Sequence, residues 1–313
     1  MRKTNSVAIL IATRNRPLAL RCLLDSILTS SIQPQQVIIV SSGQDIGSVI
    51  GEFAETLPIL HLHTKSVGQI AQKRLGVELI HQKITWCVFL DDDLILDKNA
   101  LKIAIDTAKT YPRTNVIGIG LGTPATSRGT NLPVHLEILA RLFQLSSNEL
   151  GKVLRSGHAN SYLQSACVIE TQWLNGAAIW RTEHVRNYGK DLPSTLYAAC
   201  EDLIFSYPLS KKGTLIYVPE AKVNFQETEL SNVDSFRVIE AASLWRFYFV
   251  SKYKELSLNY FFLSQIIRII YAVVNSDEPI FSLLGKLIKL NWKMLKCKFT
   301  GRSPEDLLSE LKH

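Results

Sequence analysis

The chain has 313 residues, 46% of them hydrophobic, so it can bury the core of one large domain or of one domain with an appendage. Its formal net charge of +7 predicts an anionic partner, whose kind depends on where the charge lies. Five scattered cysteines without a C-x-x-C pair indicate neither a disulfide framework nor a zinc knuckle, and they favour a reducing compartment. The apolar run Val7 to Ala12 is too short for a signal peptide and predicts a first strand.

The first half of the chain alternates between strand and helix patterns. Short apolar runs at 7–12, 37–40, 59–63 and 85–90 predict four strands. Between them, leucines and isoleucines recur at helical spacing after Pro17, over 46–54 and over 68–80. The first two strands start about thirty residues apart, which is typical of a βαβ unit. The sequence therefore predicts an α/β fold with a mostly parallel central sheet flanked by helices.

Three consecutive aspartates, Asp91, Asp92 and Asp93, follow the fourth strand. In open parallel sheets, ligands bind beyond the carboxyl ends of the strands, which is where this triplet is expected. Carboxylates this close repel one another unless positive charge lies among them. The triplet therefore either caps the following helix in a hydrated turn or binds a cation.

Six segments occur in a characteristic order between residues 6 and 227: "ILIATRNRP", "VIIVSSG", "GQIAQKRLG", "FLDDD", "WLNGAAIWR" and "CEDLIFSYPLSKKGTLIYVPEA". Together they resemble the family 2 glycosyltransferases of the GT-A fold. The resemblance implies a Rossmann-like GT-A domain over residues 1–230 that binds a nucleotide-sugar donor. A helical C-terminal region would occupy residues 231–313.

The resemblance also implies a donor site with a divalent metal. The D-x-D pair of the family falls on Asp91 and Asp93, which would bind Mn²⁺ or Mg²⁺ together with the phosphates of the donor. The donor contacts that it implies are Thr13, Arg14, Asn15, Asp45, Lys73, Arg74, Asp91, Asp92, Gly176 and Ala177. For Lys73 and Arg74, the alternative is a solvated helix face.

The pair Glu201 and Asp202 precedes a predicted helix, where acidic residues also favour the N-terminus. The resemblance implies a different role, in which Asp202 removes the proton from the acceptor hydroxyl and the transfer inverts the anomeric configuration. Glu201 would assist it or bind the acceptor. Pro208 lies inside this helix and is expected to kink or end it.

The chain departs from the family pattern at two places. Where acidic residues commonly read the base and ribose, it has Ser41 and Ser42, which leaves Asp45 as the nearest carboxylate. Where the family often has a histidine near the metal, it has Phe225, so Asn224 or Gln226 could substitute.

Four further residues have a functional and a structural interpretation. Trp173 or Trp180 could stack on a sugar, although packing in the core is the more ordinary role of tryptophan. His61 and His63 alternate along a predicted strand and therefore share one face, but a zinc site would need a third ligand.

The region after 231 has a different character. Asn259, Gln265 and Arg268 interrupt the apolar stretch 256–274, which argues against a fully lipid-exposed helix. Over 280–298, apolar residues form one stripe of a helical projection and lysines lie opposite, without an acidic residue from 280 to 304. This pattern is typical of a basic amphipathic helix on an anionic membrane, to which each lysine contributes about 1 kcal/mol. The alternative is a helix packed on the protein with a solvated basic face.

These features predict an inverting, metal-dependent glycosyltransferase of surface glycan synthesis. It would act on a lipid-linked or polysaccharide acceptor as a peripheral protein at the cytoplasmic face of the membrane, without a nucleic-acid partner. A nucleotidyltransferase is one alternative, although "ATRNRP" lacks its glycine-rich loop. A membrane-attached module that binds nucleotides or sugars without catalysis is the other.

Overall fold

The computed structural model describes residues 6–65, 68–124, 134–190, 192–193, 195, 198–226, 235–274 and 280–312. The chain divides into two compact units. The first comprises Met1–Ala125, Tyr162–Ser194 and Asp202–Leu230, and the second comprises Thr126–Ser161, Thr195–Glu201 and Ser231–His313. The expected domain boundary between residues 230 and 231 lies outside the described residues.

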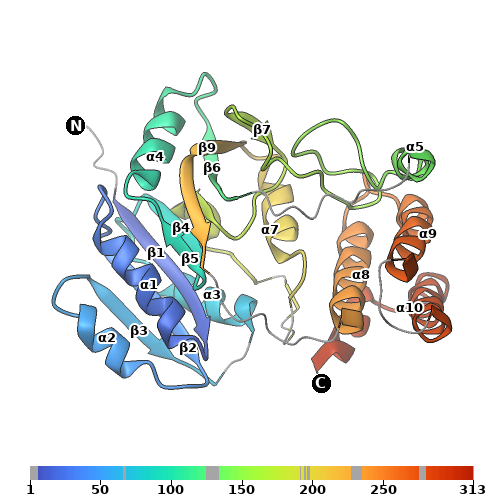
Figure 1. Cartoon of the computed structure of the whole chain (residues 1–313), viewed down its shortest axis with the longest axis horizontal. Coiled ribbons are helices and arrows are strands. Elements are labelled where there is room, and N and C mark those ends of the chain that lie inside the picture. Colours follow the sequence, from blue (N-terminus) through green and yellow to red (C-terminus); the bar gives the residue numbers. More distant parts are fainter. Residues whose placement is uncertain are drawn as a thin grey trace. The chain divides into compact units, whose positions relative to one another are not determined.

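The first unit is built on a nine-stranded sheet in the order β3-β2-β1-β4-β8-β6-β9-β5, with β7 paired to β9 (Figure 1). Its strands are β1 (Val7–Arg14), β2 (Gln36–Ser42), β3 (Ile59–His63), β4 (Trp86–Asp91), β5 (Leu94–Leu96), β6 (Val116–Gly122), β7 (Ile169–Thr171), β8 (Ala178–Arg181) and β9 (Thr214–Phe225). Strands β1 to β4 pair in parallel, whereas β8 runs antiparallel between β4 and β6. The predicted α/β class with a mostly parallel core is therefore confirmed.

Helices cover both faces of this sheet because successive side chains of a strand point to opposite faces. Val7, Ile9 and Ile11 of β1 belong to one apolar core, while Ala8 and Leu10 belong to the other. Helices α1 (Pro17–Leu28), α2 (Gly47–Phe53) and α4 (Ala100–Thr110) contribute to the first core. Helices α3 (Gln69–Glu78), α6 (Thr182–Val185) and α7 (Glu201–Leu209) contribute to the second. As expected, Pro17 begins α1 and α7 ends one residue after Pro208.

The regular elements of the second unit are helices in the described residues, with turns and one isolated β-bridge, Val153 to Ala159, between the first helix and the later ones. It contains α5 (Val134–Leu142), α8 (Ser235–Lys252), α9 (Leu258–Val274), α10 (Ile280–Thr300), α11 (Pro304–Ser309) and a 3₁₀ turn at Glu310–Lys312. Aromatic side chains of α8 fill its interior, and the Phe247 ring lies 5.8 Å from that of Phe261 on α9. Within the described part of the chain, every helix is too short or too polar to cross a bilayer.

Candidate active site

The carboxyl ends of the parallel strands meet at one edge of the sheet. In the strand register, Thr13 of β1 lies beside Ser41 of β2, and Ser41 lies beside His63 of β3. On the other side, Ala12 of β1 is paired with Asp91, the last residue of β4. The aspartate triplet therefore begins at the sheet edge where the sequence predicted it.

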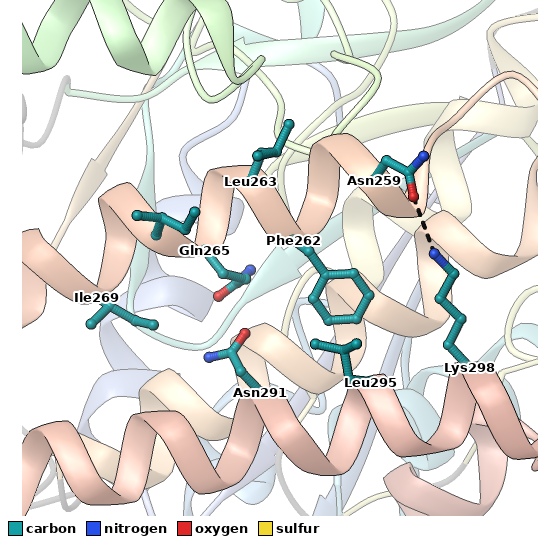
Figure 2. Close-up of a pocket in the computed structure, with 9 residues that line it drawn as sticks. Asn259, Phe262, Leu263, Gln265, Ile269, Asn291, Leu295 and Lys298 are labelled. Atoms are coloured by element: carbon teal, nitrogen blue, oxygen red, sulfur yellow. Dashed lines mark hydrogen bonds between the residues drawn. The ribbon is translucent and has the colours of Figure 1, made fainter.

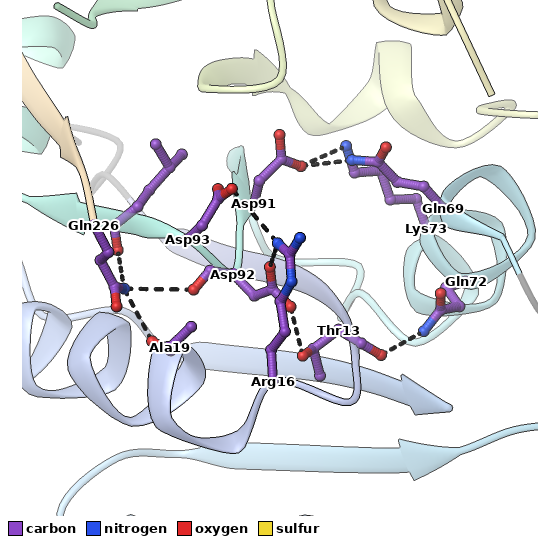
Figure 3. Close-up of polar contacts among 11 residues, drawn as sticks. Thr13, Arg16, Ala19, Gln69, Gln72, Lys73, Asp91, Asp92, Asp93 and Gln226 are labelled. Atoms are coloured by element: carbon purple, nitrogen blue, oxygen red, sulfur yellow. Dashed lines mark hydrogen bonds and ion pairs between the residues drawn. The ribbon is translucent and has the colours of Figure 1, made fainter. Parts of the chain in front are cut away.

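Asp92 connects the ends of β1 and β4. Its side chain is buried, and its Oδ2 accepts a hydrogen bond of 2.7 Å from the Thr13 hydroxyl (Figure 3). Arg16 Nη1 lies 3.1 Å from its Oδ1. Burial raises the pKa of Asp92, while the contacts with Thr13 and Arg16 oppose that rise. Both oxygens of Asp92 therefore contact the protein, and they tie the loop after β1 to the end of β4.

Asp93 is the second partner of Arg16, at 3.5 Å. Burial and the neighbouring charge of Asp91 raise the pKa of Asp93, and Arg16 opposes the rise. The carboxylates of Asp91 and Asp93 are thus close enough to repel one another. A cation between them would relieve this repulsion.

Asp91 has a different set of partners for each of its oxygens. Its Oδ1 accepts a hydrogen bond of 2.5 Å from Gln69 and lies 3.3 Å from the Lys73 ammonium, both on α3 (Figure 3). The Lys73 side chain has no solvent exposure and lies over the Phe89 ring. The alternative of a solvated face is therefore wrong for Lys73, while its neighbour Arg74 is half-buried.

The second oxygen of Asp91 points at Gly176, and so does Asp202. A Cβ placed on Gly176 would lie 2.5 Å from Asp91 Oδ2 and 3.5 Å from Asp202 Oδ2. The two carboxylates, 111 positions apart in the sequence, thus converge on one backbone point within the first unit. Only glycine leaves room for both, and Ala177 beside it is buried.

Ser206 fixes the position of Asp202 relative to this glycine. Its hydroxyl donates to the Asp202 carbonyl at 2.5 Å and accepts from the Leu174 backbone amide at 3.1 Å. The first turn of α7 is therefore tied to the segment that leads into Gly176. Glu201, the other member of the acidic pair, is buried and belongs to the second unit.

The end of β9 contacts β5 and the backbone of the aspartate triplet. Strand β5 pairs with β9 so that Leu94 lies opposite Phe225, and the Gln226 backbone amide donates to the Asp93 carbonyl at 2.8 Å. Gln226 Nε2 donates to the carbonyls of Ala19 and Leu94. Gln226 thus lies beside the triplet, with its amide nitrogen on backbone carbonyls.

The residues expected at the nucleotide lie at the β1 and β2 ends. Asn15 has a left-handed φ of 58°, and its side chain accepts a hydrogen bond from the Gln44 amide at 2.8 Å. Arg14 is exposed, and so is Asp45, whose carboxylate accepts from the Gly47 amide that begins α2. These loops leave exposed polar side chains at the carboxyl ends of β1 and β2.

His61 and His63 share a face of β3, as predicted. Ser41 Oγ lies 2.8 Å from His61 Nε2 and 3.1 Å from His63 Nδ1. Burial, followed by the neighbouring His63, lowers the pKa of His61. No group of three or more His, Cys, Asp or Glu side chains in the described residues could hold a metal ion by itself.

Both tryptophans pack in the core, as the structural interpretation expected. Trp180 is 2% exposed, and Trp173 lies 4.9 Å from the ring of Tyr162. Sequence reasoning missed Arg16, Gln69 and Ser206, which neutralise or position the aspartates. All three lie inside quoted segments, "ILIATRNRP", "GQIAQKRLG" and "CEDLIFSYPLSKKGTLIYVPEA", but nothing in those segments identifies their partners.

Asp91 and Asp93 fit a divalent metal in the chemistry of their oxygens. Mg²⁺ and Mn²⁺ prefer hard oxygen ligands and are commonly held by one or two carboxylates plus substrate phosphates. The carboxylates of Asp91 and Asp93 repel one another, and a bound cation would relieve that repulsion. Arg16 and Lys73 already neutralise part of their negative charge. The fit therefore requires phosphate oxygens to complete the coordination.

Comparison with known proteins gives a family match for the first part of the chain. The family model "Glycosyl transferase family 2" matches residues 8–167. One curated protein, the probable ATP-dependent RNA helicase spindle-E of Aedes aegypti, is 25% identical over 101 residues, which are 32% of this chain. The chain spans only 7% of the length of that relative.

Two solved structures have a similar fold. The mannosyltransferase PcManGT from Pyrobaculum calidifontis, in complex with GDP-Man and Mn²⁺, has a TM-score of 0.54 at 13% identity, over 99% of this chain and 87% of its own. S. aureus TarS 1-349 in complex with UDP-GlcNAc has a TM-score of 0.51 at 13% identity, over 95% of this chain and 92% of its own. At such low identity these likenesses show the fold alone, and they confirm the expected GT-A architecture.

Proposed function

Because this chain belongs to glycosyl transferase family 2, we propose that it is an inverting, metal-dependent enzyme that transfers a sugar from a nucleotide-sugar donor to an acceptor hydroxyl. The observation that carries this proposal is the convergence of Asp91 and Asp202 on Gly176. A donor-side carboxylate and a candidate base then face one small space, as a single displacement at the anomeric carbon requires.

Each residue has a role in this reaction. Asp202 accepts the proton of the acceptor hydroxyl, whose oxygen forms a bond to the anomeric carbon while the bond to the nucleoside diphosphate breaks. Attack from the face opposite the leaving group inverts the configuration. Ser206 holds the turn that carries Asp202, and Glu201 assists the base or binds the acceptor.

The donor side supplies the compensating charge. Asp91 and Asp93 would bind Mn²⁺ or Mg²⁺, which as a Lewis acid stabilises the negative charge that develops on the leaving diphosphate. Lys73 and Gln69 orient Asp91, and Arg16 orients Asp92 and Asp93. Arg14, Asn15, Asp45 and Arg74 are positioned by their loops or helix for contacts to the nucleotide.

The acceptor is proposed to be a lipid-linked or polysaccharide glycan at an anionic membrane surface. Support comes from α10, which carries five lysines and no acidic residue. Phe281 on this helix is 90% exposed and Trp292 is 68% exposed, which is unusual for aromatic side chains facing water alone.

The test compares Asp202→Asn with the wild type on a panel of UDP, GDP and dTDP sugars with Mn²⁺. We expect the wild type to hydrolyse one donor slowly and Asp202→Asn to lose this turnover, while the nucleotide still raises the melting temperature. Asp25→Asn, an exposed aspartate on α1, is the matched control and should keep full turnover. Donor binding without turnover, even with a crude lipid acceptor extract, would instead indicate a non-catalytic binding module.

A further inference from the structure

Helix α10 has two apolar faces. Leu283, Leu287, Leu290 and Met294 are buried and pack inside the helical unit. At 100° per residue, a separate sector contains four exposed apolar residues. Their exposed fractions are 90% for Phe281, 56% for Ile288, 68% for Trp292 and 75% for Phe299. The first face explains why α10 packs on the protein, but the second remains exposed.

The exposed apolar surface continues onto α9, which contacts α10. Leu263, Ile266 and Ile270 are exposed on α9, and their spacing puts them on one face of that helix. Between the two helices lies a groove of about 560 Å³ (Figure 2). It is lined mainly by apolar side chains, including Phe262, Ile269 and Leu295. Leu263 and Ile266 also line the groove, so the exposed face of α9 continues into it, and the two exposed faces with the groove are called the α9–α10 surface below.

Four polar side chains line this groove, Asn259, Gln265, Asn291 and Lys298. Lys298 stands at one end, bonded to Asn259 at 3.1 Å (Figure 2). Gln265 is 4% exposed, and its buried Nε2 has no hydrogen-bond partner among the residues that the structure describes. Within the described part of the chain, the buried Oδ1 of Asn291 on the facing helix also lacks a partner. Burying such atoms without partners is costly, so the groove suits an occupant that carries polar atoms as well as hydrocarbon.

Cations flank the apolar surface on one side. Lys286, Lys289 and Lys296 are exposed on α10, in the sector next to the exposed aromatic residues. An apolar surface bordered by lysines is complementary to the interface of an anionic bilayer, where phosphates lie just above the hydrocarbon. This charge complementarity selects a membrane lipid over a neutral apolar partner.

We propose that the α9–α10 surface docks on an anionic membrane and that its groove takes one hydrocarbon chain of an anionic phospholipid. The phosphate accepts from Lys298, an ester carbonyl accepts from Gln265, and the chain lies along Phe262, Ile269 and Leu295. The inference deepens the proposed membrane setting of the transferase. Its measurements use no sugar donor, so its failure is separate from failure of the catalytic proposal.

The docking surface is tested with vesicles of phosphatidylcholine, with or without phosphatidylglycerol. We expect the 313-residue chain to bind only the anionic vesicles. Phospholipids brominated on their chains should quench the fluorescence of Trp292, which is obtained by subtracting the signal of the Trp292→Phe variant. The double variant Phe281→Ser, Phe299→Ser should weaken binding at least about tenfold. Leu18→Ser, at a comparably exposed apolar residue of the first unit, should change nothing.

The groove is tested with lysophosphatidylglycerol below its micelle concentration, since it has one chain and one phosphate. One molecule should bind per chain, and Ile266→Asn at the exposed groove rim should weaken it about tenfold. Lys298→Gln should remove the preference over lysophosphatidylcholine. Vesicle binding without stoichiometric lysophospholipid binding overturns the groove assignment. A concentration-dependent dimer that the double variant dissociates, with no vesicle binding, assigns the surface to a second copy and overturns the whole proposal.

Discussion

Replacing Gly176 by alanine should separate the two carboxylates that converge on it. The new Cβ would lie 2.5 Å from Asp91 Oδ2, whereas ordinary contacts begin at 3.4 Å, so the carboxylate must move by about 1 Å. Gln69 and Lys73 hold its other oxygen, so the movement also disturbs that pair. A misplacement of about 1 Å can reduce an enzymatic rate about 100-fold, equivalent to about 2.7 kcal/mol of transition-state stabilisation.

The assay is kcat/KM for sugar transfer or donor hydrolysis, with the melting temperature measured in parallel. Gly51→Ala is the matched control, because a Cβ on Gly51 in α2 meets nothing within 4 Å. We expect that control to keep full activity and to gain slightly in stability, since alanine favours a helix over glycine. A Gly176→Ala protein with wild-type kcat/KM and an unchanged melting temperature would refute the proposed role of this close approach.

Three further predictions concern charge. Asp91→Asn removes the carboxylate that faces the fully buried Lys73, and it should lower the free energy of unfolding, measured in urea, by about 3 kcal/mol. Lys73→Met leaves a partly solvated Asp91 and should lower the free energy of unfolding by less. Equal losses in the two variants would contradict this asymmetry. Asp93→Asn relieves repulsion from Asp91 and should raise the melting temperature at pH 7 without metal, and a lower one would show that its contact with Arg16 dominates. Folding lowers the pKa of His61, so the melting temperature should fall as the pH drops below about 6.5 toward that lowered pKa. His61→Asn should reduce this fall. If the wild type and His61→Asn depend on pH identically, His61 does not cause the effect.

The strand and helix order was readable from the chain because it depends on local periodicity. The apolar runs at 7–12 and 85–90 predicted β1 and β4, and Pro17 predicted the start of α1. The C-terminal position of Asp91 on a parallel strand followed from that order, since ligands gather at this edge. The six short segments were also sufficient to indicate the family.

The partners of the aspartates were not readable in the same way, because they come from distant positions. Lys73 was expected either on a solvated helix face or at the donor, and the fold excludes the solvated face by burying Lys73 against Asp91. Arg16 was not singled out in the sequence, because its contacts with the triplet depend on the β1 and β4 ends lying side by side. Charge neutralisation depends on distances of a few ångström, which sequence spacing does not determine.

The amphipathic pattern of 280–298 illustrates the same limit. An apolar stripe and a lysine stripe on one helix could be predicted without the structure, because a period of 3.6 residues is a local property. That Leu283, Leu287 and Leu290 pack inward while Phe281 and Trp292 remain exposed became known from the fold, because it depends on which helices pack against α10. Likewise, Gly176 and Asp202 were each named from short motifs, but their approach to Asp91 depends on how β4, the loop before β8 and α7 pack. Local pattern sets which elements form, and long-range packing sets which side chains meet.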